Sequence, residues 1–198
     1  MDDGYIKFEL DWKQDDEPLL AGLEDLLFWR NKMYDLNLIG HDDQHNVGFG
    51  NISQRVRKNQ FVISGTQTGH IEKLSIEHYT TVVDYDIQKN SLKCLGPVKA
   101  SSESLTHAAI YEVDPSIKAI IHIHHDTQWN KWLDKVPTTD KRVPYGTPEM
   151  ALEIHRLFRE TPKDEMSVIA MAGHQGGLIS FGESHAEAAK PFLEVFQD

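Results

Sequence analysis

The stretch KAIIHIHHDTQ, residues 118–128, constrains the fold of this chain more than any other. Its isoleucines favour a buried strand, because a core removes their apolar surface from water. A histidine in such a strand loses hydration unless it finds a polar partner. Side chains two positions apart in a strand lie on one face, about 6.6 Å apart along the chain. We therefore expect His122 and His124 to share a face and His125 to point to the other.

Two imidazoles on one face of a strand can converge on one metal ion. The alternative is a pair of core histidines bonded to backbone carbonyls, and the H-x-H pattern alone does not decide between them. A third histidine, His174, follows an apolar strand in AMAGHQGGLISFG, where it binds metal or is a solvated turn residue. Three histidines with an open fourth position are typical of catalytic zinc, whereas closed structural sites usually contain thiolates. Cys94 is the only cysteine, so a closed thiolate site is excluded.

The segment KASSESLTHAAIYEVDP predicts a helix over residues 103–113 with Glu103 in its first turn. Serine is a favoured N-cap, and an acid in the first turn complements the helix dipole, so a purely structural role is one reading. The other reading is functional. A helix N-terminus beside the hydroxyls of Ser101 and Ser102 can bind an anion, and a carboxylate there can reach a metal or act as a base.

Two turns, GFGNIS and SGTQTGH, are rich in glycine and hydroxyl side chains and contain neither lysine nor arginine. They include Asn51, Thr68 and Gly69. Such turns are common in hairpins. Their backbone N–H groups and hydroxyls can also form a cradle for a phosphate.

The remaining patterns predict an α/β fold in which helices are interleaved with strands and hairpins around a mixed, largely antiparallel sheet. We expect one domain over residues 1–198, with Pro18 near the start of the first helix and Pro191 as a kink or restart in the last. The expected strands are residues 5–12, 47–53, 61–64, a hairpin over 80–96 that turns at 89–90, 118–125, and two strands within 166–182; the expected helices are 17–36, 103–113, 147–160 and 183–197.

Composition narrows the class of partner and compartment. The formal net charge is -11, which repels phosphate backbones, so we expect no nucleic acid partner. No apolar run approaches the length of about 20 residues that a membrane helix needs, and the acidic start lacks the pattern of a secretory signal. We expect no membrane partner and a cytoplasmic location.

In their order along the chain, GNIS, TG, SSE, HIH and GHQGGLI resemble the class II aldolase/adducin family over about residues 19–196. The resemblance implies a three-layer αβα fold around a mostly antiparallel sheet. It also implies a homotetramer whose sites lie between neighbouring subunits. The predicted strand within residues 1–17 would be an addition to the family fold.

The same resemblance implies that His122, His124 and His174 bind a divalent metal, usually zinc, and that Glu103 is the catalytic carboxylate. It implies a substrate phosphate on Asn51, Thr68, Gly69, Ser101 and Ser102. The expected function is a zinc-dependent aldolase-type lyase that acts on a small phosphorylated sugar, with the metal as Lewis acid. A dehydratase, a 4-epimerase and a non-catalytic, metal-binding assembly module remain alternatives.

Two departures from the family pattern concern substrate binding and proton transfer. The turn ISGTQTG is longer than usual, so Ser64–Gly65 replaces or joins Thr68–Gly69 in one interpretation. The stretch between His125 and Pro144 is shorter than in the family, whose aldolases have a catalytic tyrosine near there. Tyr145 is the nearest remaining tyrosine in the sequence, but VPYGTP is typical of a structural turn.

Overall fold

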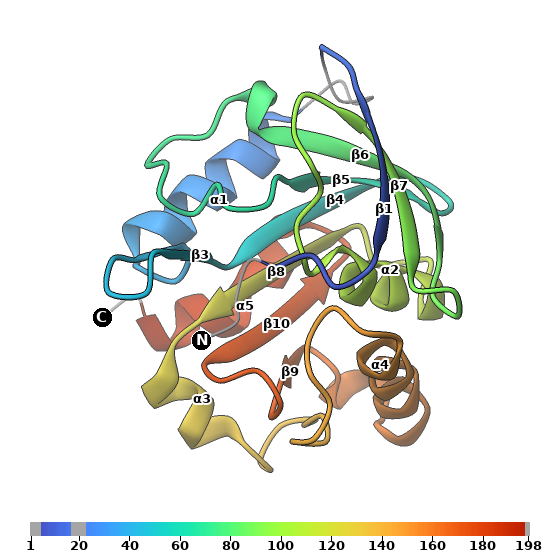
Figure 1. Cartoon of the computed structure of the whole chain (residues 1–198). Coiled ribbons are helices and arrows are strands. Elements are labelled where there is room, and N and C mark those ends of the chain that lie inside the picture. The colour runs from blue at the N-terminus through green and yellow to red at the C-terminus, as the bar shows by residue number, and fades with distance from the viewer. Residues whose placement is uncertain (1–4, 17–22, 197–198) are drawn as a thin grey trace.

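The structure is a computed structural model that describes residues 5–16 and 23–196. Its centre is an eight-stranded sheet (Figure 1). The strand order is β1-β7-β6-β5-β4-β8-β10-β9. The bounds are β1 Glu9–Gln14, β4 Asn51–Arg57, β5 Gln60–Ser64, β6 Tyr79–Asp86, β7 Ser91–Gly96, β8 Ala119–His124, β9 Val168–Ala170 and β10 Gly177–Gly182. A small separate sheet pairs β2 (Gly40–Asp42) with β3 (Val47–Phe49).

Every pairing in the large sheet is antiparallel except that of β1 with β7, which is parallel. The mixed, mostly antiparallel sheet predicted from the sequence is therefore confirmed. Because β1 and β9 are the edge strands, the histidine strand β8 lies inside the sheet, between β4 and β10. Its backbone is thus held from both sides, which fixes the direction of its side chains.

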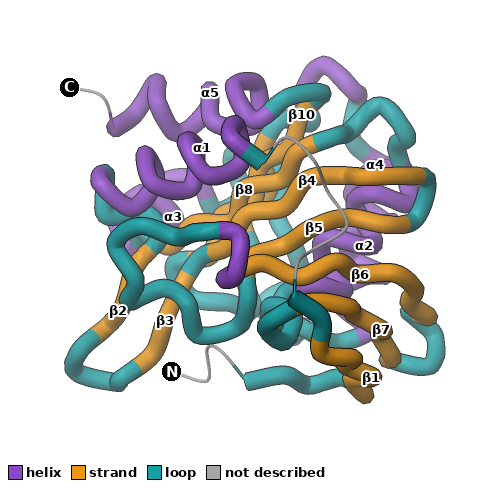
Figure 2. The backbone as a smooth tube through the Cα atoms, turned by 90° about the horizontal axis from the view of Figure 1, so that it is seen from above, coloured by secondary structure: helices purple, strands orange, loops and turns teal. Residues whose placement is uncertain are grey.

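Helices cover both faces of the sheet, as Figure 2 shows from above. On one face lie α1 (Glu24–Asp35) and α5 (His185–Phe196), and on the other lie α2 (Ser104–Val113) and α4 (Pro148–Glu160). A short helix, α3 (Asp126–Trp132), follows β8, and two 3-10 turns span Ile76–His78 and Lys163–Glu165. The predicted three-layer αβα architecture is confirmed.

Each helical layer packs on its own hydrophobic core. Leu26 of α1 and Phe192 of α5 are fully buried with Ile121 of β8. Leu105 of α2 and Ile154 of α4 are fully buried on the opposite face, in a second cluster. Successive apolar residues of β8 therefore face different cores, which is why its sequence is nearly continuous in isoleucine.

Several element bounds differ from the predictions. The predicted strand 47–53 is interrupted at Gly50, whose φ of 74° is left-handed and whose Cβ, if present, would lie 2.8 Å from an Ile39 side-chain carbon. The chain turns there from β3 into β4. The predicted strand 5–12 is shifted, since β1 spans Glu9–Gln14. The hairpin turn at 89–90 is confirmed, with Asn90 at a φ of 51° between β6 and β7.

The bounds of the helices agree more closely with the predictions. The predicted start of the first helix, with Pro18, Leu19 and Leu20, lies outside the described residues, and α1 is described from Glu24. The last helix runs through Pro191 without a restart. Glu103 stands at the N-cap of α2 and not in its first turn, because the helix begins at Ser104. The sequence reading did not predict α3.

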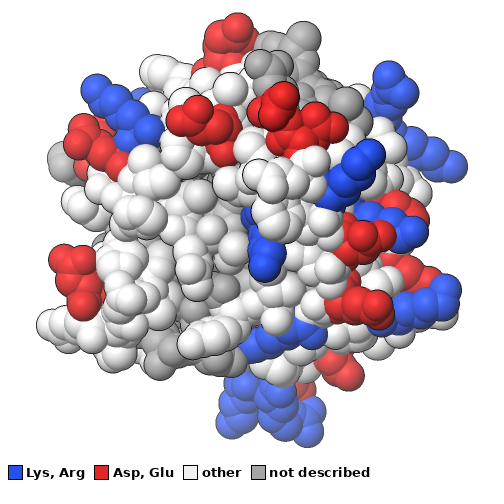
Figure 3. Space-filling view, turned by 45° about the horizontal axis from the view of Figure 1, so that its top comes forward, with Lys and Arg blue, Asp and Glu red and all other residues white. Residues whose placement is uncertain are grey.

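Within residues 5–16 and 23–196, no helix is long and apolar enough to cross a membrane. On the face drawn in Figure 3, acidic and basic side chains of the described residues are interspersed, without a broad basic area.

Candidate active site

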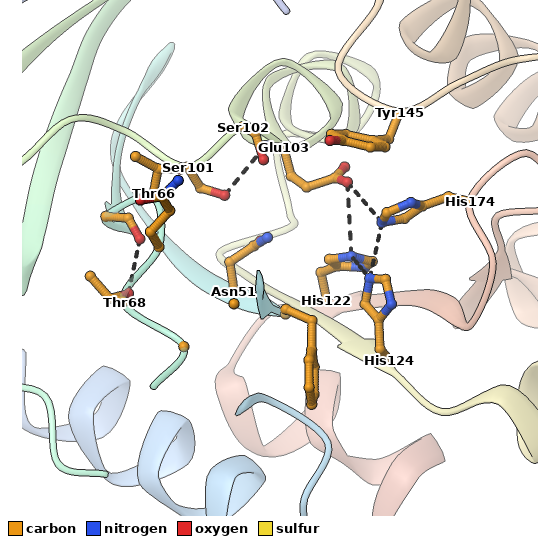
Figure 4. A pocket seen from close by; sticks show the side chains of 16 residues that line it. Asn51, Thr66, Thr68, Ser101, Ser102, Glu103, His122, His124, Tyr145 and His174 are labelled. Atoms are coloured by element: carbon orange, nitrogen blue, oxygen red, sulfur yellow. Dashed lines mark hydrogen bonds and ion pairs between the residues drawn. The ribbon is translucent and has the colours of Figure 1, made fainter. Parts of the chain in front are cut away.

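The three predicted metal histidines come together at one end of the sheet. His122 and His124 project from β8, and His174 comes from the loop between β9 and β10. The Nε2 atom of His124 lies 3.1 Å from that of His122 and 3.0 Å from that of His174. Their potential ligand atoms all lie within 4.8 Å of one another, so the described residues contain a group that can hold a metal ion. Figure 4 shows the three rings facing one another.

Strand pairing explains how His174, 50 positions after His124, comes to lie beside His122 and His124. In the antiparallel register of β8 with β10, Gly177 is opposite His124. A Cβ at Gly177 would lie 2.6 Å from the His174 ring, so only glycine leaves room for that ring. The glycines after His174 therefore fold the imidazole back onto the strand that carries the other two.

The tautomer of His122 suits metal binding. Its Nδ1 lies 3.0 Å from the Leu178 carbonyl oxygen, which can only accept a hydrogen bond, so Nδ1 carries the proton and Nε2 presents its lone pair. Burial lowers the pKa of His122 to about 4. Burial also lowers the pKa of His124 well below its usual range. Both imidazoles are then neutral near pH 7, the form in which histidine binds a metal.

Glu103 approaches the histidines from α2 (Figure 4). Its Oε1 lies 3.2 Å from His174 Nε2 and 3.9 Å from His122 Nε2. Its Oε2 accepts a hydrogen bond from the Thr106 hydroxyl at 3.1 Å. Burial raises the pKa of Glu103, but His174 and His122 outweigh that effect and the pKa falls to about 2. The side chain is thus a buried carboxylate directed at the imidazole cluster.

The start of α2 was expected to serve as a helix cap, as an anion-binding site, or as both. The Glu103 side chain makes no capping hydrogen bond, so it does not stabilise the helix start in the expected way. The Ser101 hydroxyl accepts instead from the Glu103 backbone N–H at 3.3 Å. The Ser101 and Ser102 side chains are each about 5 % exposed and both residues line the pocket that contains the histidines.

All residues predicted to bind phosphate line this one pocket, together with Glu103 and the three histidines. The five are Asn51, Thr68, Gly69, Ser101 and Ser102. Asn51 is opposite His122 in the β4–β8 register, and its side chain points into the pocket (Figure 4). Asn51 is only 6 % exposed, and its Oδ1 has no hydrogen-bond partner among the described residues. Since buried polar atoms are usually satisfied, this oxygen is available to a ligand.

The longer turn ISGTQTG contributes more than one residue to the pocket wall. Gly65 joins Thr68 and Gly69 there, and the Thr68 hydroxyl donates to the Gly65 carbonyl at 2.9 Å. Ser64 does not line the pocket, because its hydroxyl accepts from the Ile52 backbone N–H at 3.2 Å in the core.

Six further residues line the pocket that were not predicted as site residues, although five of them lie in the two turns considered as a phosphate cradle and Tyr145 was interpreted as part of a structural turn: Gly48, Phe49, Gly50, Thr66, Gln67 and Tyr145. Tyr145 does lie in a turn, as predicted, but its ring also packs on His174 with 4.4 Å between ring centroids. No local pattern separates such a wall residue from a structural one. Its position after the histidine strand was a signal in the sequence, but the VPYGTP pattern gave no sign of the contact with His174.

His125 lies apart from the metal-binding face. Its Nδ1 accepts from the Gln128 N–H as the N-cap of α3, at 3.1 Å, and its ring packs on Phe196. Trp129 and Trp132 pack against the α1–α5 core and do not line the pocket. The helix after β8 is therefore a structural support for the end of the strand.

A family model described as the Class II Aldolase and Adducin N-terminal domain matches residues 33–196. The chain therefore belongs to the class II aldolase/adducin family. A 77-residue stretch is 34% identical to 3-oxo-tetronate 4-phosphate decarboxylase of Haemophilus influenzae and covers 39% of this chain. It spans 33% of that relative, so the alignment covers only about a third of its length.

Solved structures show the same fold. L-fuculose 1-phosphate aldolase superposes with a TM-score of 0.65 at 19% identity, over 90% of this chain and 83% of that one. YgbL of Klebsiella pneumoniae, for which aldolase, epimerase and decarboxylase activities are candidates, gives 0.64 at 18% identity over 88% and 84%. A sugar-phosphate aldolase of Thermotoga maritima gives 0.57 at 16% identity over 87% and 96%.

Proposed function

We propose that this protein is a zinc-dependent lyase that cleaves or forms a carbon–carbon bond beside a carbonyl group in a small phosphorylated sugar. The observation that carries the proposal is a single pocket that combines three histidines, a buried carboxylate and a wall of hydroxyl, amide and backbone groups. The family is named for class II aldolases, and an L-fuculose 1-phosphate aldolase has the same fold, which favours this reaction.

The metal would be held by His122, His124 and His174, since their neutral imidazoles are suitable donors and their nitrogens converge. Zinc is our choice among divalent ions, because three imidazoles with an open position are typical of catalytic zinc. When bound, such a metal acts as a Lewis acid on a carbonyl or hydroxyl oxygen.

Glu103 would move the proton. Its carboxylate borders the pocket beside the histidines, so a substrate hydroxyl or C–H group bound there lies within reach of Oε1. In aldol cleavage the base takes the hydroxyl proton, the carbon–carbon bond breaks, and its electron pair is delocalised into the neighbouring carbonyl. Glu103 is ionised near pH 7, so its carboxylate is in the form that can accept a proton.

The phosphate would lie against the helix start and the ISGTQTG turn, on Asn51, Thr68, Gly69, Ser101 and Ser102. These residues line the pocket together, and among the described residues no lysine or arginine lines its wall. Binding would therefore depend on hydrogen bonds from hydroxyl, amide and backbone N–H groups, as in other anion-binding concavities.

Decarboxylation of a 3-oxo acid phosphate is a second candidate, favoured by the 34% identical relative that is named for such a reaction. Loss of CO₂ from a 3-oxo acid also leaves an electron pair beside a carbonyl. A proton donor then completes the ketone. The same pocket groups would serve both reactions, so the substrate decides between them.

The test is a panel of phosphorylated substrates given to zinc-loaded protein. Separate readouts would follow aldol cleavage, CO₂ release, dehydration and 4-epimerisation. Aldol cleavage above the rate of a His122→Ala/His124→Ala control supports the first proposal, and CO₂ release supports the second. Dehydration or epimerisation would assign the site to the alternative reactions. Bound metal without turnover would identify a non-catalytic assembly module.

We also propose a homotetramer, as the family resemblance implies. Light scattering coupled to size exclusion should give four times the chain mass of 22.6 kDa, and a monomer at working concentration would contradict the proposal.

A further inference from the structure

The N-terminal segment contacts Tyr145, a residue of the active-site pocket wall, although it precedes the residues that the family model matches, which begin at 33. Strand β1 lies at the sheet edge beside β7, where Figure 1 draws it in dark blue. The Asn90 side-chain amide donates to the Lys7 carbonyl at 2.8 Å, and the Glu9 N–H donates to the Asn90 carbonyl at 2.9 Å. These bonds fix the backbone on both sides of Phe8.

Lys7 is placed by this arrangement on an aromatic ring of the pocket. Its Nζ lies 3.7 Å from the centroid of the Tyr145 ring, a cation–π contact. The neighbouring Phe8 is only 6 % exposed and belongs to the same core cluster as Tyr145. The contact is therefore supported by a buried anchor and does not depend on a freely moving lysine.

Tyr145 also contacts the catalytic groups. It lines the pocket, is 3 % exposed, and packs on His174 with 4.4 Å between ring centroids. Figure 4 shows its hydroxyl on the side of Glu103 and Ser102. Gly146 has a φ of 67°, and a Cβ there would lie 2.9 Å from the Ser102 carbonyl, so the turn fits closely against the helix start. Tyr145 thus connects Lys7 to the pocket.

Building on the proposed function, we propose that the N-terminal segment is part of the active site. Lys7 is a positioning residue that holds the Tyr145 ring against His174. Tyr145 is a substrate-contacting wall residue beside the three histidines. A phosphorylated carbonyl compound bound at the histidines would touch this ring and its hydroxyl, so its orientation depends on a residue outside the family domain.

The contact itself can be tested without turnover. The chain has 6 tyrosines, so 3-fluorotyrosine labelling gives a simple ¹⁹F NMR spectrum in which Tyr145→Phe identifies one resonance. Lys7→Met should shift that resonance and Lys7→Arg should shift it less, since arginine also binds aromatic faces. Lys13→Met is the matched control, because Lys13 is an exposed lysine of the strand β1 that follows Lys7 in the same N-terminal segment. An unchanged Tyr145 resonance in Lys7→Met would overturn the proposal.

The effect on function is tested with the substrate that the panel identifies. Lys7→Met should lower kcat by about 2- to 30-fold, the factor that corresponds to typical cation–π energies. KM should change little, because the phosphate cradle is untouched. Lys7→Arg should restore most of kcat, and Lys13→Met should match wild type. In a Tyr145→Leu background, Lys7→Met should have almost no further effect.

Two kinetic results would contradict the positioning role: a wild-type kcat in Lys7→Met, or an equally large Lys7 effect when Tyr145 is already leucine.

If the wild-type chain acts on no substrate, the proposed function fails separately. The affinity of zinc-loaded protein for phosphoglycolohydroxamate, a metal-chelating phosphate compound, then replaces kcat. Weaker binding to Lys7→Met than to Lys13→Met would support the wall role of Tyr145, and equal binding would refute it.

Discussion

Replacing Glu103 by glutamine separates a catalytic carboxylate from a structural one. The carboxylate is 3 % exposed, its Oε1 faces the histidines and its Oε2 accepts from Thr106. Glutamine keeps the shape and can still accept the Thr106 hydrogen bond through its oxygen. It loses the negative charge and cannot accept a proton. The change therefore tests proton transfer with little disturbance of packing.

Glu103→Gln should lower activity strongly and still leave the protein folded. General-base catalysis typically contributes about 10²- to 10⁴-fold, so turnover should fall by roughly that factor. For stability, the pKa of Glu103 falls from 4.5 to about 2 on folding. A difference of about 2.5 units corresponds to at most about 3 kcal/mol. This contribution is complete above pH 4.5 and is lost as the pH falls through about 2. The glutamine variant should thus remain folded at pH 7.

The assay combines three measurements on the same preparation. These are circular dichroism for folding, elemental analysis for bound metal, and turnover of the identified substrate. Glu112→Gln is the matched control, since Glu112 lies on α2 but does not line the pocket. We expect a folded, metal-containing and nearly inactive Glu103→Gln protein. A decrease in turnover of less than a few-fold, with metal retained, would refute the role of Glu103 as the base.

Three further predictions concern other groups. His124→Ala should remove most of the bound metal in elemental analysis, whereas His125→Ala should retain it and lose only about 1 kcal/mol of stability as a lost N-cap; equal metal loss in both would contradict the assignment of faces. Asn51→Ala should weaken inorganic phosphate binding in calorimetry by about 10-fold or more, as expected for a lost hydrogen bond to a charged group, and an unchanged affinity would exclude Asn51 from the cradle. Burial lowers the pKa of His107 from 6.5 to about 3, so its neutral form stabilises the fold above pH 6.5 and this stabilisation is lost as the pH falls toward 3. The urea midpoint of metal-free protein should therefore decrease between pH 7 and 5, and less steeply in His107→Gln; parallel curves would contradict this.

Local patterns predicted most elements because they depend on periodicity and on turn chemistry. The isoleucine run identified β8, and the Lys89–Asn90 turn identified the β6–β7 hairpin. Bounds failed where a single residue responds to distant neighbours. Gly50 interrupts the predicted strand with a φ of 74°, and a Cβ there would lie 2.8 Å from Ile39 and 3.0 Å from the His122 carbonyl oxygen, which come from other parts of the chain.

The site residues that lie in short local motifs were predicted from the sequence, and those without a motif were not. His122, His124, Glu103, Ser101 and Ser102 stand in short, recognisable segments, and the structure brings them into one pocket. Phe49, Thr66 and Gln67 carry no motif that separates them from ordinary turn residues. They become pocket residues only because the fold brings β3 and the turn after β5 to the pocket that His122 and His124 of β8 also line.

The sequence by itself determined the same-face pair in β8, because alternation along a strand is a property of the backbone alone. It also determined the amphipathic helices and the glycine-rich turn that carries His174. Only the tertiary structure decided the distance of 3.0 Å between His124 and His174 and the contact of Lys7 with Tyr145. Both depend on pairings between segments far apart in the chain, β8 with β10 and β1 with β7. The register of such pairings is set by the packing of the whole core, which no single segment encodes.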